Sequence, residues 1–182
     1  MDTVVIILII AAVVVLAIGA WWYMQRRKRA QLRARFGPEY ERAIDLTDDR
    51  RERREAEAEL AERAARRDQL NVRELNPSVQ ARYVARWREV QAAFVDQPGT
   101  AVRDAEALVA EVMRERGYPV DDFETQADLI SVDHPNLVEN YRESHAIALR
   151  HERNEASTDD LRRAFIHYRG LFDELLGTPA DR

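Results

Sequence analysis

Residues 76–94, NPSVQARYVARWREVQAAF, predict the fold class more clearly than any other stretch of the chain. The large apolar side chains in this stretch recur at intervals of three or four residues, at Val79, Tyr83, Trp87, Val90 and Phe94. That spacing places them on one face of an α-helix that packs against a core. Pro77 suits the first helical position, with Asn76 as the cap.

Residues 71–177 repeat this pattern, with apolar faces separated by Pro, Gly and capping residues. We expect four more helices: one from the cap Thr100 to Gly117, one starting at Asp121, one from Pro135 to Arg153, and one from Ser157 or Thr158 to Gly177. No stretch after residue 30 alternates as a strand would. The sequence therefore predicts an all-α domain over 71–177, a small bundle of about five helices. Aromatic residues would supply much of its core, namely Trp87, Phe94, Tyr141, Phe165 and Phe172. Residues 178–182 should fray.

Residues 37–70 predict a charged helical spacer in front of this domain. Gly37-Pro38 should stop or bend the preceding helix. Residues 48–68 contain seven Arg and eight acidic residues, and their apolar residues are mostly Ala. The segment lacks a sustained apolar heptad stripe, which argues against a long coiled coil. The alternative to a solvated spacer is a helix that pairs with a partner protein or with a second copy of the chain.

The first 24 residues predict a transmembrane anchor. Val4 to Met24 contains no charged residue, and a helix of that length spans about 30 Å, the thickness of the hydrocarbon layer. Three aromatic residues close the run, Trp21, Trp22 and Tyr23, and such rings prefer the headgroup level. A cleavable signal peptide would carry its positive charge before the apolar run rather than after it. We therefore expect a retained anchor.

A basic juxtamembrane segment follows at residues 25–36. Its first part carries Arg26, Arg27, Lys28 and Arg29. Basic residues favour the cytoplasmic side, so the prediction is a single-pass protein of the bacterial inner membrane with its N-terminus outside and its C-terminal domain in the cytoplasm. The same cluster would sit at the membrane interface with the three aromatic residues, where it either only fixes the topology or also holds anionic lipid.

The charge distribution and composition exclude several functions. The whole chain carries −5; because Asp2 contributes −1 and residues 25–35 contribute +6, residues 36–182 carry −10. An acidic body is poorly suited to a phosphate backbone, so we expect no nucleic-acid partner. The absence of Cys excludes disulfides, thiol catalysis and Cys-bound metals.

The densest polar stretch is SVDHPNLVENYRESH, residues 131–145. Asp133 beside His134 could act as an acid–base pair, with His145 on the same predicted helix. The structural alternative is that Asp133 or His134 caps the helix opened by Pro135, while His145 is a partly buried, hydrogen-bonded core residue. His151 and His167 flank apolar faces and should lie at the surface. The histidines lack any standard metal spacing, so we predict no metal and no cofactor.

Three phrases of the sequence resemble a family of uncharacterised bacterial proteins, often labelled as membrane or secreted. These phrases are RFGPEYER (35–42), ERGYPVDDFE (115–124) and SVDHPNLVENYRESH (131–145). The resemblance covers nearly the whole chain. It implies a bacterial, membrane-anchored protein and transfers no catalytic residue.

The predicted function is a membrane-tethered helical module that binds a partner protein or a second copy of itself. Tethering would raise the local concentration of the module without any new contact. One alternative is a small enzyme or ligand-binding domain centred on Asp133, His134 and His145. The other is an extracytoplasmic envelope protein.

Overall fold

The structure is a computed structural model that describes residues 2–45 and 49–177, with side chains from Val13 onward. The described residues form eight helices and no strand, which confirms the all-α prediction. The helices are α1 (Asp2–Phe36), α2 (Pro38–Asp45), α3 (Arg50–Asp68), α4 (Pro77–Ala93), α5 (Pro98–Arg116), α6 (Phe123–Asp133), α7 (Val138–Glu152) and α8 (Thr158–Leu176). The chain divides into two compact units, residues 1–61 and 62–182, and the boundary falls within α3.

The first unit is organised around the break at Gly37. This glycine has a φ of +47°, a left-handed conformation that non-glycine residues rarely adopt, and it separates α1 from α2. The predicted end of the first helix at this position is confirmed. The Glu57 carboxylate of α3 accepts hydrogen bonds from Arg29 of α1 and from the Tyr40 hydroxyl of α2, both at 3.1 Å. One acidic side chain thus connects all three helices of the unit.

The predicted transmembrane anchor at residues 1–24 is wrong. Within the residues that the structure describes, no helix is both long enough and apolar enough to cross a membrane. Side chains 1–12, which carry part of the predicted span, lie outside the described residues. The predicted single-pass topology and inner-membrane localisation are overturned by the same finding.

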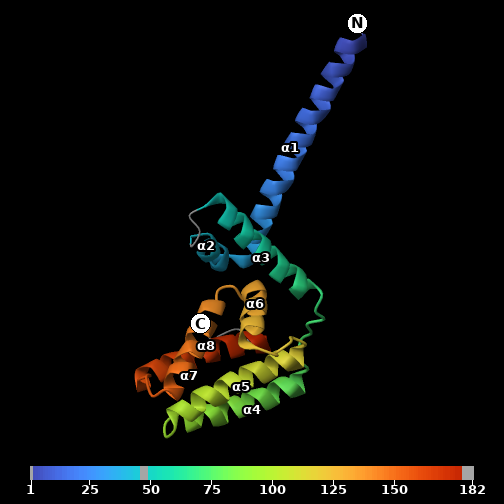
Figure 1. The fold of residues 1–182 in the computed structure, drawn as a ribbon. Helices are drawn as coiled ribbons and strands as arrows, with labels where there is room; N and C mark the ends of the chain where they lie inside the picture. The colour runs from blue at the N-terminus through green and yellow to red at the C-terminus, as the bar shows by residue number, and fades with distance from the viewer. Residues whose placement is uncertain (1, 46–48, 178–182) are drawn as a thin grey trace. The chain divides into compact units, whose positions relative to one another are not determined.

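The second unit is a bundle in which α5 and α8 are central (Figure 1). Helix α5 packs against α4, α7 and α8, and α7 also packs against α6 and α8. Trp87 is buried and stacks on Phe165 and Phe172, with ring centroids 5.1 and 4.6 Å apart. Of the five aromatic residues predicted for the core, only Phe94 is partly rather than fully buried, and it still packs against Phe165.

Several helix ends match the sequence pattern. Asn76 caps α4 and accepts a hydrogen bond from the Ser78 amide at 3.0 Å. Ser157 caps α8 in a reciprocal capping box with Asp160. Gly117 and Gly177 end α5 and α8 in the left-handed conformation. These starts and stops depend on local hydrogen bonds, which explains why the sequence predicts them.

Three predicted helix starts are wrong. Helix α5 begins at Pro98, before Thr100, because proline suits the first helical position. The cap of α6 is Asp122, which accepts from the Thr125 amide at 2.8 Å, and not Asp121. Helix α7 begins at Val138, not at Pro135.

Candidate functional site

Asp133, His134 and His145 all lie in the second unit, but the structure gives each of them a different partner. Asp133 is the last residue of α6, and His134 is the C-terminal cap of that helix. The prediction that either one caps the start of α7 is therefore wrong. Their partners come from separate elements: Arg67 and Tyr118 for Asp133, Glu174 for His134, and Glu106 for His145.

Asp133 forms a clamp between α3, the segment after α5, and α6. Its carboxylate accepts hydrogen bonds from the Arg67 guanidinium and from the Tyr118 hydroxyl, the latter at 2.5 Å. Burial, and then the hydrogen bond to Asp133, raise the pKa of the Tyr118 phenol. The hydroxyl therefore stays protonated and donates a hydrogen bond to the carboxylate. A carboxylate that accepts hydrogen bonds from a cation and a phenol acts as a structural anchor between the elements that carry them.

His134 has one nitrogen near an acidic side chain and one without a partner. Its Nδ1 lies 3.5 Å from a carboxylate oxygen of Glu174 on α8. Its Nε2 is buried and has no hydrogen-bond partner among the described residues. Burial lowers the pKa of the imidazole, an effect that outweighs the opposing influence of the Glu174 charge. The ring is therefore neutral near pH 7, with an unsatisfied nitrogen.

A cavity of about 340 Å³ lies beside His134, between the segment that precedes α4 and the C-terminal end of α8. It is lined by Glu74, Leu75, Gln80, Arg116, His134, and residues 174–177. The Arg116 guanidinium donates to the backbone carbonyls of Leu175 and Arg73, at 3.0 and 3.3 Å. The Gln80 amide donates to the Leu176 carbonyl at 2.9 Å. The contacts to Leu175 and Leu176 satisfy carbonyl groups that the end of α8 leaves without intrahelical partners.

His145 belongs to a polar cluster inside the bundle. Its Nδ1 lies 2.5 Å from the Glu106 carboxylate of α5, and its ring stacks on Phe123 at 3.7 Å between centroids. The Tyr141 hydroxyl donates to the Gln126 side chain at 2.8 Å. The side chain of His145 is partly buried, as the sequence predicts for a hydrogen-bonded core histidine. The Glu106–His145 pair connects α5 with α7.

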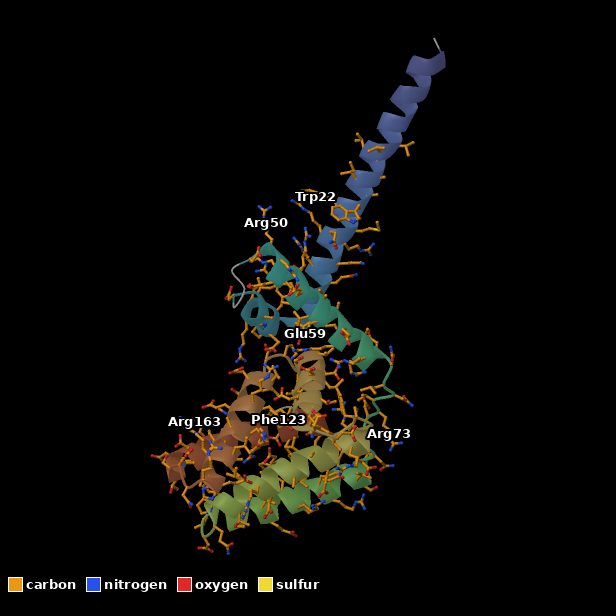
Figure 2. All side chains as sticks on the ribbon, viewed as in Figure 1. Trp22, Arg50, Glu59, Arg73, Phe123 and Arg163 are labelled. Carbon is orange, nitrogen blue, oxygen red and sulfur yellow. The ribbon has the colours of Figure 1, made fainter. Side chains whose placement is uncertain are left out.

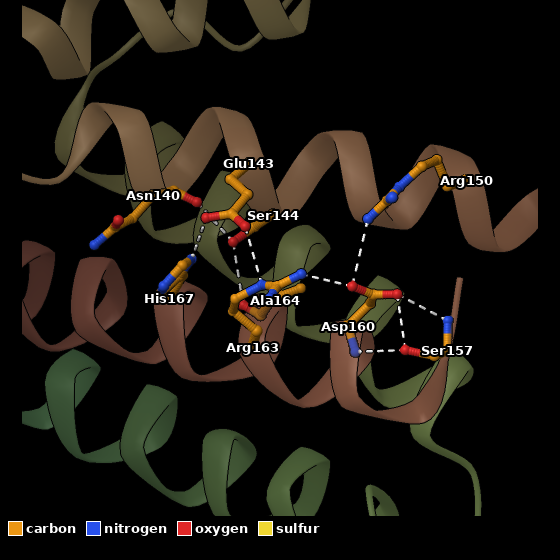
Figure 3. A network of polar contacts seen from close by, with 9 residues as sticks. All are labelled: Asn140, Glu143, Ser144, Arg150, Ser157, Asp160, Arg163, Ala164 and His167. Carbon is orange, nitrogen blue, oxygen red and sulfur yellow. Dashed lines mark hydrogen bonds and ion pairs between the residues drawn. The ribbon is translucent and has the colours of Figure 1, made fainter. Parts of the chain in front are cut away.

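The interface of α7 and α8 contains a row of polar contacts (Figure 3). Arg163 contacts Glu143 at 3.0 Å and Asp160 at 2.5 Å, and His167 lies 3.6 Å from the other oxygen of Glu143. His167 is thus largely buried at this interface. The prediction that it lies at the surface is therefore wrong. The two helices run antiparallel, because residue numbers rise along α7 as those of their partners fall along α8.

A second cavity, of about 250 Å³, lies between the end of α3 and α6. Leu70 and Leu129 contribute apolar walls. At its edge the Asp128 carboxylate lies 3.0 Å from Arg63 and 3.3 Å from Arg66, so one negative charge faces two positive charges.

The largest set of exposed apolar side chains lies on α1. Nine large residues between positions 13 and 24 are 49–72% exposed: Val13, Val14, Val15, Leu16, Ile18, Trp21, Trp22, Tyr23 and Met24. Figure 2 shows the Trp22 side chain projecting from the helix. The Arg26 guanidinium lies over the Trp22 ring, 4.0 Å from its centroid, and Arg27, Lys28 and Arg29 follow on the exposed surface.

Over residues 2–45 and 49–177, no group of three or more His, Asp or Glu side chains is placed to hold a metal ion. No family model, curated protein or solved structure matches the chain. Its function therefore has to follow from its exposed surfaces and side-chain contacts.

The partners of the predicted site residues were missed by sequence reasoning. Glu106 lies 39 residues before His145, and Arg67 lies 66 residues before Asp133. Neither Glu106 nor Arg67 belongs to a sequence motif. In the sequence alone, an acidic residue or an arginine that forms a buried pair looks the same as one that faces solvent. Only the packing of the helices brings these pairs together.

Proposed function

We propose that this chain is a helical protein-interaction module that acts by binding a partner protein rather than by catalysis. The observation that carries the proposal is the exposed apolar stretch of α1, residues 13–24. Exposed apolar surface of this extent is uncommon on monomeric proteins and marks an interaction site. Removing it from water would supply about 25 cal/mol for each Å² that a partner covers.

The distribution of these side chains constrains the partner. Four consecutive residues, Val13 to Leu16, are all about half exposed or more. Because successive residues of a helix point about 100° apart, the apolar surface extends around α1 and does not form one stripe. A partner that covers it must therefore enclose the helix in a deep groove or between several helices.

The end of the stretch supports the same proposal. Trp21, Trp22 and Tyr23 are of the residue types that contribute most to binding energy at protein interfaces. The exposed basic residues that follow would add selectivity for a partner with acidic side chains at the rim of its groove.

The contacts in the second unit favour binding over catalysis. Asp133 is held by Arg67 and Tyr118, and the two histidines of the predicted site are paired with acids on different helices. Acyl transfer or hydrolysis would instead need a nucleophile, a base and an orienting group that converge on one point.

The test is co-purification of the tagged full chain from its own cells. We expect one stoichiometric partner protein to be retained by the wild-type chain, and the double variant Trp21→Ser/Trp22→Ser to weaken binding about 30-fold or more. Ile166→Ser is the matched control, because Ile166 is 60% exposed on α8, close to the 57% and 56% of the two tryptophans. Association with protein-free lipid vesicles together with the absence of any protein partner would contradict the proposal.

A further inference from the structure

The cavity between the end of α3 and α6 has the size of a site for a small ligand. Its volume is about 250 Å³, and all the residues that line it belong to the second unit. Pockets for drug-sized molecules hold roughly 300–1,000 Å³, and an engineered apolar cavity of about 150 Å³ in another protein binds benzene. A ligand with about six carbon atoms therefore fits the space between these two cases.

The apolar part of the cavity comes from three separate segments of the chain. Leu70 follows α3, Pro119 lies between α5 and α6, and Leu129 belongs to α6 and to the hydrophobic core. A ligand tail that covers these side chains removes apolar surface from water, which favours binding. The walls therefore select a ligand with an apolar tail over a bare ion.

Two arginines and one acid set the charge at the edge of the cavity. The Asp128 carboxylate lies 3.0 Å from Nε of Arg63 and 3.3 Å from Nη2 of Arg66. One negative charge against two positive charges leaves an excess of one positive charge. A cation would be repelled by that excess, whereas an anion with a single charge would neutralise it.

Arg66 and Gln69 supply hydrogen-bond donors for such an anion. The side chain of Arg66 is 55% exposed, and within the described part of the chain its guanidinium makes one hydrogen bond, from Nη2 to Asp128. A guanidinium has a planar fork of N–H donors that matches a carboxylate, so further donors remain. Gln69 follows three residues later, on the same side of the chain, with an exposed amide.

The C-terminal end of α3 does not oppose an anion strongly. Its last carbonyl groups would carry the negative pole of the helix dipole. Those of Arg66 and Arg67 accept hydrogen bonds from the backbone amides of Gln69 and Leu70, at 3.2 and 3.1 Å. These two carbonyls are therefore satisfied within the chain.

We propose that this cavity binds a small monocarboxylate with a short aliphatic tail. The Arg66 guanidinium and the Gln69 amide would donate hydrogen bonds to the carboxylate, and the tail would cover Leu70, Pro119 and Leu129. The single charge of the ligand matches the single excess positive charge at the edge of the cavity. The site lies wholly in the second unit and does not depend on the function proposed for residues 13–24 of α1.

The probes are hexanoate, 1-hexanol and n-hexylammonium, which differ mainly in the charge of the head group. Each is titrated into the full chain with 13C-labelled leucine methyl groups, and the Leu70 and Leu129 signals report on the cavity. Hexanoate should move both signals to saturation with a Kd about tenfold below that of 1-hexanol, because hydrogen bonds between charged groups are stronger than neutral ones. n-Hexylammonium should bind more weakly than 1-hexanol, since the excess positive charge repels it.

Two arginine variants separate the site from general electrostatics. Arg66→Gln should weaken hexanoate binding about tenfold and leave 1-hexanol binding unchanged. Arg169→Gln is the matched control and should leave both unchanged. Arg169 is 52% exposed and lies 3.5 Å from the Asp173 carboxylate, against 55% and 3.3 Å for Arg66 and Asp128.

Three results would overturn the proposal: equal affinities for the three probes, unmoved Leu70 and Leu129 signals, or equal losses of hexanoate binding in the two variants. The comparison of probes uses the wild-type chain, so it remains decisive even if a variant fails to fold.

Discussion

Single residues in the second unit are paired across long distances in the sequence. The Asp133 clamp joins α6 to α3 and to the segment after α5, and the Glu106–His145 pair joins α5 to α7. Buried polar groups of this kind cost free energy unless each one is satisfied, so their loss should be measurable one residue at a time.

Tyr118→Phe tests the Asp133 clamp. The substitution removes one hydrogen bond to a carboxylate but keeps the ring, and we expect it to lower the free energy of unfolding by about 2 kcal/mol. Urea denaturation followed by circular dichroism measures this loss. Tyr83→Phe, at another buried tyrosine, serves as the control for removing a hydroxyl. If Tyr118→Phe and Tyr83→Phe both have a negligible effect on the free energy of unfolding, the Asp133 clamp does not contribute to stability.

His134 should make stability depend on pH. Burial lowers its pKa in the folded chain, whereas in the unfolded chain the imidazole takes up a proton near pH 6.5. The unfolded state therefore binds more protons in this range, and the free energy of unfolding falls as the pH drops below about 6.5. His134→Asn cannot titrate and should show a shallower decline. Identical declines in wild type and variant, measured by denaturation between about pH 7.5 and 5.5, would show that His134 does not contribute.

At the scale of elements, four helix ends that one local hydrogen bond decides were predicted correctly, whereas the cap of α6 was predicted one residue too early, at Asp121 instead of Asp122. The four correct positions are Ser157, Asn76, Gly117 and Gly177. The start of α7 was not predicted correctly, because proline at position 135 fits equally well in a turn. The Leu137 amide donates to the His134 carbonyl at 2.9 Å, so residues 134–137 form a turn between α6 and α7. Whether Pro135 starts a helix or lies in a turn depends on how α6 and α7 pack, and the local sequence does not encode that packing.

Gly117→Ala tests a helix end on which packing depends. Gly117 has a φ of +97°, and a Cβ there would lie 2.9 Å from the Asn71 backbone carbonyl oxygen. We expect a loss of about 2 kcal/mol or more from strain and contact together. Gly177→Ala is the matched control, because its φ of +72° carries strain while, among the residues up to 177, no atom other than those of its chain neighbours lies within 4 Å of the new Cβ. Thermal unfolding should rank the two losses in this order, and the reverse order would contradict the account.

At the scale of the whole molecule, periodicity predicted the core of the second unit well. The apolar face of 76–94 contributes Trp87, which contacts the apolar face of α8 through Phe165 and Phe172. The membrane prediction is contradicted on the described residues, where no helix is long and apolar enough to cross a membrane. The sequence singled out Asp133, His134 and His145 as candidates but not their partners, because these partners lie on other elements.

Trp87 tests the core at this scale. Trp87→Ala should lower the free energy of unfolding by about 3–5 kcal/mol, because the indole is 4% exposed and stacked on two rings. Trp87→Phe should cost markedly less, since it keeps a ring and removes an indole N–H that is buried without a partner among the described residues. Both are measured by urea denaturation with circular dichroism. A phenylalanine variant as unstable as the alanine variant would argue against stacking as the main contribution.

The central claim is that the exposed apolar stretch of α1 binds a protein. The most direct measurement is site-specific photo-crosslinking in living cells, with p-benzoylphenylalanine at position 22 of the full chain and, as control, at position 166. Both native side chains are more than half exposed on helices. We predict one protein adduct of defined mass at position 22 and none at position 166. Adducts to lipid alone at position 22, or the same adducts at both positions, would contradict the claim.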